Sequence, residues 1–190
     1  AIRAVKLGVA RAHMIDRDLD GALLLEFFTT QGVGTVISRE RLARMRHAGV
    51  EDVPAIVALL RDDALGATRE HTDLRPYEAA FADIDADPRH LLVVGELEGD
   101  VVACLQATVL PCLTHGGRRR AQVEGVRVDA DRRGSGIGAA LLRWTIAWAR
   151  AEGCGVVQLT TDRSRPDARR FYESLGFVAT HDGMKLPLDP

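Results

Sequence analysis

One short segment constrains the fold of this 190-residue chain more than any other: a turn with three alternate glycines, Gly134, Gly136 and Gly138. Residues 121–128 before it alternate apolar and polar side chains as a strand does, and residues 138–152 have the apolar periodicity of a helix. Glycines between a strand and a helix let backbone N–H groups converge, and the helix N-terminus adds the positive end of its dipole. Two arginines directly upstream add positive charge. The segment therefore predicts a phosphate-binding turn in an α/β fold.

Two kinds of phosphate site compete for this turn. Read as Gly-x-Gly-x-x-Ala, residues 134–139 match the dinucleotide fingerprint, and Asp162 at the end of the next strand offers a ribose partner. That fingerprint needs its first glycine at the end of the strand, whereas residues 129–133 intervene here. Read as Arg-x-x-Gly-x-Gly from Arg133, the segment forms a pyrophosphate-binding turn instead. A tight turn without any ligand is the third interpretation.

The rest of the chain supports a sheet of mixed direction. Periodicity, caps and turn residues predict alternating strands and helices after residue 40. The expected strands are 42–47, 91–96, 101–110, 121–128, 156–161 and a last hairpin of 177–179 with 184–186. The expected helices are 50–60, part of 72–87, 138–152 and 164–175, the last with Ser164 as its cap.

Composition narrows the function classes. A net charge of -2 argues against a dedicated nucleic-acid binder, and 46% hydrophobic residues suffice for a core. No apolar run reaches the roughly 18 residues of a membrane span, and no signal-peptide pattern opens the chain. Cys104, Cys112 and Cys154 form no C-x-x-C pair, which favours reduced thiols over a metal site. We therefore expect a cytoplasmic protein that uses no nucleic acid, membrane or metal.

The order of two motifs carries a family resemblance. The Arg133-x-x-Gly136-x-Gly138 turn is followed, after one helix and one strand, by Ala-Arg-Arg-Phe-Tyr-Glu-Ser-Leu-Gly-Phe at 168–177. Over residues 41–188 the chain resembles the GNAT superfamily of acyl-CoA-dependent N-acyltransferases. The resemblance implies an α/β GNAT fold over residues 40–190, with a mixed, mostly antiparallel central sheet flanked by helices.

The resemblance also implies an activity. It is N-acetyl transfer from acetyl-CoA to a primary amine of a small molecule or peptide, by direct attack in a ternary complex. The pantetheine arm of acetyl-CoA would pair with the backbone of Val126, Arg127 and Val128. The pyrophosphate would bind the turn. Its expected ligands are the amides of Arg133, Gly134, Ser135, Gly136, Ile137, Gly138 and Ala139. A regulatory module that binds acyl-CoA without catalysis is an alternative.

Two side chains are candidates for proton transfer. Glu124 shares a strand face with Val126, where the thioester is expected, and would accept the proton of the amine. An ion pair with Arg127 or with the Arg118–Arg120 cluster is the alternative role of Glu124. Tyr172 stands at the family position whose phenol reaches the sulfur of CoA, and would donate a proton to the leaving thiolate; an amphipathic core residue is the alternative.

One position departs from the family pattern. Many relatives carry Asn after the strand that corresponds to residues 156–161, where it contacts the pantetheine amides, and Asp162 stands there in this chain. A carboxylate accepts but does not donate, so the contact at Asp162 is in question. Arg165, with its neighbours Arg163 and Arg170, either reaches the CoA phosphates or forms a solvated helix face.

Residues 1–39 fall outside the acyltransferase and are expected to be a short helix-strand appendage. A helix is expected at 21–28 and a strand at 33–37. Residues 5–37 resemble the last segment of the amino-acid-kinase domain of N-acetylglutamate kinases and synthases. That resemblance implies glutamate as an alternative acceptor. The apolar side chains of Leu23, Leu24, Phe27 and Phe28 need a partner, which predicts either an intramolecular contact or a homodimer.

Charge divides the chain into two parts. Residues 118–172 contain more arginines than carboxylates, as an anionic cosubstrate requires, whereas residues 70–100 are acidic. The acidic part suits either a cationic acceptor amine or a solvated surface. Within it, Tyr77 and Phe81 are one helical turn apart and either line the acceptor pocket or belong to the core.

Overall fold

The computed structural model describes residues 1–9, 11–23, 34–38, 43–62 and 69–188. The chain separates into two compact units, Ala1–Arg44 and Met45–Pro190. In the first unit, α1 (Ile2–Lys6) is followed by the antiparallel pair β1 (Arg11–Met14) and β2 (Thr35–Ser38). The helix expected at 21–28 begins at Ala22, and its positions from 24 on lie outside the described residues. The expected strand corresponds to β2, while α1 and β1 were not foreseen.

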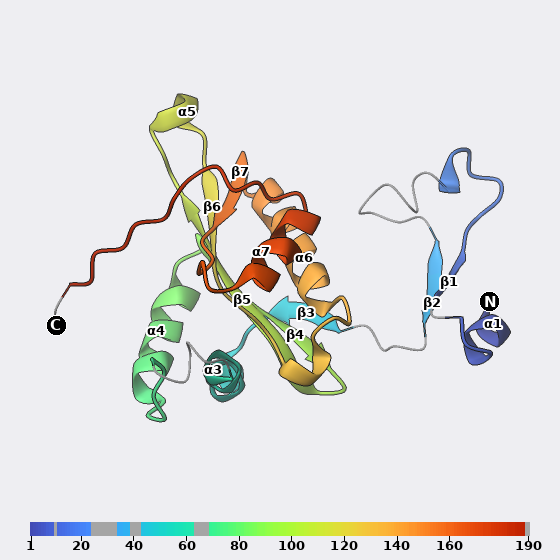
Figure 1. Cartoon of the computed structure of the whole chain (residues 1–190), viewed down its shortest axis with the longest axis horizontal. Helices are drawn as coiled ribbons and strands as arrows, with labels where there is room; N and C mark the ends of the chain where they lie inside the picture. The colour runs from blue at the N-terminus through green and yellow to red at the C-terminus, as the bar shows by residue number, and fades with distance from the viewer. Residues whose placement is uncertain (10, 24–33, 39–42, 63–68, 189–190) are drawn as a thin grey trace. The chain divides into compact units, whose positions relative to one another are not determined.

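The second unit is built on a five-stranded sheet in the order β3-β4-β5-β6-β7 (Figure 1). Its strands are β3 (Arg44–His47), β4 (His90–Leu97), β5 (Asp100–Leu110), β6 (Arg120–Val128) and β7 (Val156–Leu159). Neighbours pair antiparallel from β4 to β6, and β6 pairs parallel with β7. The expected α/β fold with a mixed, mostly antiparallel sheet flanked by helices is confirmed.

Helices cover both faces of this sheet (Figure 1). On one face, α3 (Val53–Arg61) packs Ile56 and Leu59 against Val94 and Cys104, and α4 (Arg75–Ala86) lies beside it. On the other, α6 (Ile137–Ala151) buries a stripe at helical spacing, and α7 (Pro166–Ser174) follows β7. The fully buried members of that stripe include Leu141, Leu142 and Thr145. Burial of each large apolar side chain contributes about 1.5–3 kcal/mol. Short turns complete the unit: η1 (Val50–Asp52), α5 (Thr114–Gly117) and η2 (Ala130–Arg132).

A bulge interrupts the pairing of β5 with β6. Cys104 lies opposite Arg127 and Gln106 opposite Glu124, so β6 carries one more residue than β5 in this interval. Gly125 has φ +61°, the left-handed conformation that a glycine adopts at such a bulge. Bulges re-aim the residues around them, and this one lies in the middle of the predicted site.

Two local predictions are wrong. No strand forms in residues 177–188: Met184 is 95% exposed and Leu186 84% exposed, so these side chains find no surface that would hold a hairpin. A hairpin without packing against a further layer is marginal. Ser164 is not the cap of α7 either. The N-cap residue is Arg165, and the Ser164 hydroxyl donates to Asp162 Oδ1 at 2.7 Å.

Candidate active site

The glycine turn joins the end of β6 to α6. Gly134 has φ +79°, and Gly136, the N-cap residue of α6, has φ +89°. Side chains with a Cβ rarely adopt such angles, so both glycines are needed to aim the backbone into the helix. Ser135 steadies the turn by donating its hydroxyl to the Arg132 carbonyl at 2.6 Å. The N–H groups that open α6 have no partner within the helix, and such groups at a helix N-terminus are suited to an anion.

Gly138 serves a different purpose from the other two glycines. An added Cβ would lie 3.2 Å from Phe171 Cζ and 3.4 Å from Val128 Cγ2. The missing side chain therefore lets α6, α7 and β6 approach one another. This contact brings the second sequence motif, on α7, to the first.

The edge of β6 is open where the pantetheine arm is expected. Pairing with β7 ends at Val123–Leu159, while β5 still pairs with Arg127 and Val128 on the other side. The carbonyl of Val126 accepts from Arg127 Nη1 at 2.9 Å, and that of Val128 from Arg133 Nε at 3.2 Å. A carbonyl oxygen has two lone pairs, so both can accept a further hydrogen bond from an extended ligand.

Glu124 is exposed on β6, directly before the bulge. Its register partner is Gln106 on β5. Within the described part of the chain its carboxylate forms no salt bridge, and the ion pair considered for it with the Arg118–Arg120 cluster is absent there. The carboxylate is therefore accessible to solvent and to a ligand.

Tyr172 is half-buried on α7, between Phe171 and Phe177. Its ring meets Phe177 edge-on, with 5.9 Å between centroids. Burial raises the pKa of the phenol, and the charges of Arg127 and Arg165 oppose that shift. The positive charges that act on the phenol of Tyr172 therefore come from Arg127 on β6 and from Arg165, the N-cap residue of α7. A phenol with a raised pKa stays protonated at neutral pH, as a proton donor must.

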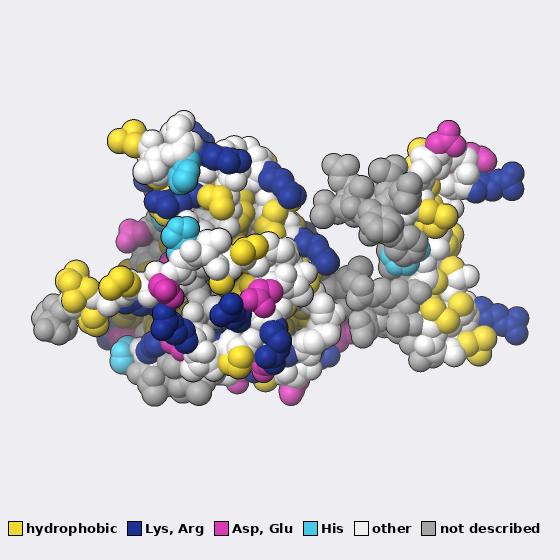
Figure 2. Space-filling view, turned by 45° about the horizontal axis from the view of Figure 1, so that its top comes forward, with side chains coloured by type: hydrophobic (Ala, Val, Ile, Leu, Met, Phe, Trp, Pro, Cys, Tyr) yellow, Lys and Arg dark blue, Asp and Glu magenta, His cyan; other side chains and the backbone are white. Residues whose placement is uncertain are grey.

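Asp162 and the arginines near it are largely paired. Asp162 Oδ1 accepts from the Ser164 N–H at 2.9 Å as well as from the Ser164 hydroxyl, and these bonds lower the pKa of the carboxyl. Arg163 pairs with Asp182, and Arg170 with Asp167. Dark-blue and magenta side chains accordingly lie side by side on the face that carries α7 (Figure 2). Asp162 thus fixes the turn that leads to Arg165.

A cavity of about 150 Å³ lies between α3, α4 and the sheet. Tyr77 and Phe81 on α4 both line it, with Gly125 of the bulge as part of the opposite wall. The sequence pointed to Tyr77 and Phe81 as one of two alternatives. It carried no signal for the wall formed by Leu60, Cys104 and Gly125, because the bulge that brings them together arises from strand pairing.

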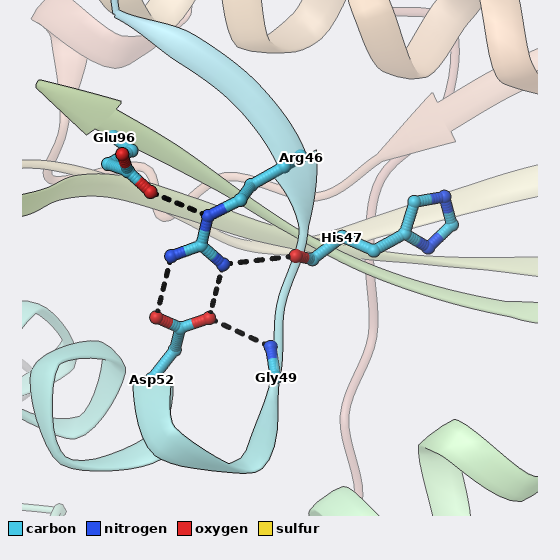
Figure 3. Close-up of polar contacts among 5 residues, drawn as sticks. All are labelled: Arg46, His47, Gly49, Asp52 and Glu96. Carbon is cyan, nitrogen blue, oxygen red and sulfur yellow. Dashed lines mark hydrogen bonds and ion pairs between the residues drawn. The ribbon is translucent and has the colours of Figure 1, made fainter. Parts of the chain in front are cut away.

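An ionic cluster of Arg46, Asp52 and Glu96, for which the sequence carried no signal, lies at the start of α3 (Figure 3). Arg46 donates to both oxygens of Asp52, at 2.6 and 2.9 Å, and to Glu96 Oε2 at 2.7 Å. Asp52 is 5% exposed and also accepts from the Gly49 N–H at 2.8 Å. Arg46 is the main cause of the lowered pKa of Asp52. The cluster joins β3, the start of α3 and β4.

The described residues contain neither a membrane-spanning helix nor a metal-binding cluster. Over residues 1–9, 11–23, 34–38, 43–62 and 69–188, no helix is long and apolar enough to cross a membrane. In the same ranges, no three His, Cys, Asp or Glu residues are placed to hold a metal ion.

The site geometry, an open strand edge running into a glycine turn at a helix N-terminus, agrees with comparisons to known proteins. Residues 53–177 match the model of the Acetyltransferase (GNAT) family. The chain belongs to this family. Among solved structures, a transcriptional regulator from Bacillus halodurans is 42% identical with a TM-score of 0.74, covering 77% of this chain and 99% of its own. A putative acetyltransferase from Agrobacterium tumefaciens is 31% identical with a TM-score of 0.70, covering 76% and 99%.

Curated relatives are longer than this GNAT chain. An amino-acid acetyltransferase from Ralstonia nicotianae is 32% identical over 184 residues, which are 96% of this chain and 37% of the relative. The chain thus spans about two fifths of the length of the curated relatives it matches.

Proposed function

We propose that this chain transfers an acetyl group from acetyl-CoA to a primary amine of a small molecule or peptide, and that residues 40–190 carry the activity. The observation that carries the proposal is the open edge of β6, which ends at the glycine turn before α6. An extended pantetheine arm would pair along Val126, Arg127 and Val128. Its pyrophosphate would bind the amides from Arg133 to Ala139, and Arg165 would add positive charge for the CoA phosphates.

In the proposed reaction the amine nitrogen attacks the thioester carbon and the carbon–sulfur bond breaks. The backbone at Val126 orients the carbonyl for attack. Glu124 removes the proton that the amine must lose, directly or through one water, since its carboxylate is exposed beside the bulge. Tyr172 supplies a proton to the departing thiolate and regains one from solvent. The net products are the amide and coenzyme A with a free thiol.

A pair of glycine variants tests the cosubstrate site. Gly134→Ala and Gly153→Ala each force a Cβ onto a residue with positive φ, +79° and +72°, and neither Cβ meets an atom within 4 Å. The two variants therefore carry similar backbone strain, but Gly153 follows the C-terminal end of α6, whereas Gly134 precedes its N-terminal end. We expect Gly134→Ala to raise the KM for acetyl-CoA at least tenfold in a thiol-release assay, and Gly153→Ala to leave it unchanged. Equal KM values would contradict the proposal.

Glutamate is a second candidate acceptor. The match to an amino-acid acetyltransferase extends over 96% of this chain, including the N-terminal segment, and favours an amino acid as the substrate. Incubation with acetyl-CoA and L-glutamate, followed by detection of N-acetylglutamate, distinguishes this acceptor from other amines.

A further inference from the structure

The cavity between α3, α4 and the sheet lies next to the proposed point of reaction. Its wall includes Gly125, the residue directly before Val126, and Gln106, the register partner of Glu124. A Cβ at position 125 would lie 3.9 Å from Leu60 Cδ2, so the glycine keeps this side of the cavity wide. An acceptor whose amine lies between Glu124 and the backbone at Val126 could therefore place a neighbouring substituent in this cavity.

The cavity wall is apolar. Among the described residues, none that lines it carries a charge, and most are aliphatic or aromatic. The hydroxyl of Tyr77 is already engaged, since it donates to Glu70 Oε2 at 2.8 Å and accepts from the His71 N–H at 2.8 Å. Burial raises the pKa of the Cys104 thiol to about 12, so this side chain is neutral as well. An ionised carboxylate or ammonium group would lose its hydration here and find no oppositely charged partner among the described lining residues, of which only the amide of Gln106 and the engaged hydroxyl of Tyr77 are polar.

The volume sets the size of the group. A dry protein cavity of about 150 Å³ lined by aliphatic and aromatic side chains accommodates a benzene molecule. The cavity of this chain has a similar volume and, among the described residues, a mostly apolar lining, and it is partly open to solvent.

From this position, lining and volume we infer that the acceptor carries a neutral apolar group of phenyl or isobutyl size near its amine, and that this cavity binds that group. The inference rests on the proposed acetyl transfer and specifies its substrate class. It ranks apolar amines above glutamate, whose side-chain carboxylate finds no cation in the wall, and above diamines.

A panel of acceptors tests the ranking. With saturating acetyl-CoA, kcat/KM is measured for 2-phenylethylamine, L-phenylalanine, L-glutamate and putrescine. We expect at least one apolar acceptor to exceed both glutamate and putrescine by about tenfold or more, the discrimination that a hydrophobic pocket supplies. A higher kcat/KM for glutamate or putrescine overturns the inference and leaves acetyl transfer standing.

Variants of the lining residues test whether the preference for apolar amines arises in the cavity. Leu60→Trp fills it from α3, and Ala80→Phe narrows it from an exposed position on α4 that perturbs the core less. We expect each to raise the KM for the best apolar amine about tenfold or more, with the KM for acetyl-CoA unchanged. Leu113→Trp, at a side chain that is 98% exposed, is the matched control. An unchanged amine KM in both cavity variants overturns the inference.

Calorimetry separates this inference from the proposed function. Binding of 2-phenylethylamine is measured with and without coenzyme A, in the original chain and in Leu60→Trp. Binding that Leu60→Trp abolishes, together with no acetyl transfer to any amine, supports the cavity assignment and refutes the transfer. Absence of both binding and transfer refutes both.

Discussion

Removal of the Asp52 carboxylate should destabilise the second unit more than any surface ion pair does. Asp52→Ala deletes three hydrogen bonds at once, two from Arg46 and one from the Gly49 N–H. Breaking a buried ion pair costs about 3–5 kcal/mol. Arg46 keeps its 2.7 Å hydrogen bond to Glu96 and its side chain is 27% exposed, so its charge is not left buried without a partner. The lower end, about 3 kcal/mol, is therefore expected.

Urea denaturation followed by tryptophan fluorescence measures this loss. Both tryptophans, Trp144 and Trp148, lie on α6, so the signal reports on the second unit. With an m-value of about 2 kcal/mol/M, a loss of about 3 kcal/mol lowers the urea midpoint by about 1.5 M. The control is Arg163→Ala. It removes an ion pair that is just as short, 2.7 Å, but whose partners are 86% and 84% exposed. We expect a loss of about 0–1 kcal/mol there.

The difference in unfolding free energy between the original chain and Asp52→Ala should depend on pH, and this dependence identifies the Asp52 carboxylate as the source of the difference. The pKa of Asp52 is lowered from 3.8 in the folded chain, so the group adds stability above the unfolded pKa and loses it as the pH falls through the folded pKa. The gap in unfolding free energy between the original chain and Asp52→Ala should be constant from about pH 5 to 8 and decrease below about pH 4. A midpoint shift equal to that of Arg163→Ala, or a gap that stays constant into acid, would refute this reasoning.

Three further variants test the proposed chemistry. Tyr172→Phe should lower kcat about 100-fold with an unchanged KM for acetyl-CoA. Because burial raises the pKa of the phenol, the decrease of kcat at alkaline pH in the original chain should lie above pH 10, and it should be absent in the variant. Glu124→Gln should lower kcat for a fixed amine about 100-fold with an unchanged KM for acetyl-CoA, and an unchanged kcat would exclude the carboxylate as the base. Gly138→Val should cost about 1–3 kcal/mol of unfolding free energy, measured in urea, because its Cβ would lie 3.2 Å from Phe171.

Much of the fold could be predicted because its signals are local. The stripe of α6 recurs at helical spacing, and the strands of the second unit alternate or carry β-branched runs. The glycines at 134 and 136 have positive φ, which local backbone sterics require in any protein that contains this turn. The last hairpin did not form for the complementary reason: its short apolar runs are a local strand signal, but strands need a surface to pack on.

The candidate site was predictable only in part. Its two motifs are contiguous in sequence, so the turn and Tyr172 could be named in advance. Gly138 was expected to bind phosphate through its amide, and the structure adds a packing role, because Phe171 lies against it. Asp162 was considered for a ligand contact, and the structure shows that its carboxylate holds the turn before α7.

By itself, then, the sequence determined the secondary structure around the glycine turn, the family and the residues expected at the acetyl donor. Only the tertiary structure decided the acceptor side. The bulge at Gly125 depends on the pairing of β5 with β6, and Arg46 finds Glu96 from 50 residues away. The cavity needs α3, α4 and three strands in place at once. The proposed donor site consists of backbone groups that a local motif specifies, whereas the proposed acceptor site consists of side chains that only folding brings together.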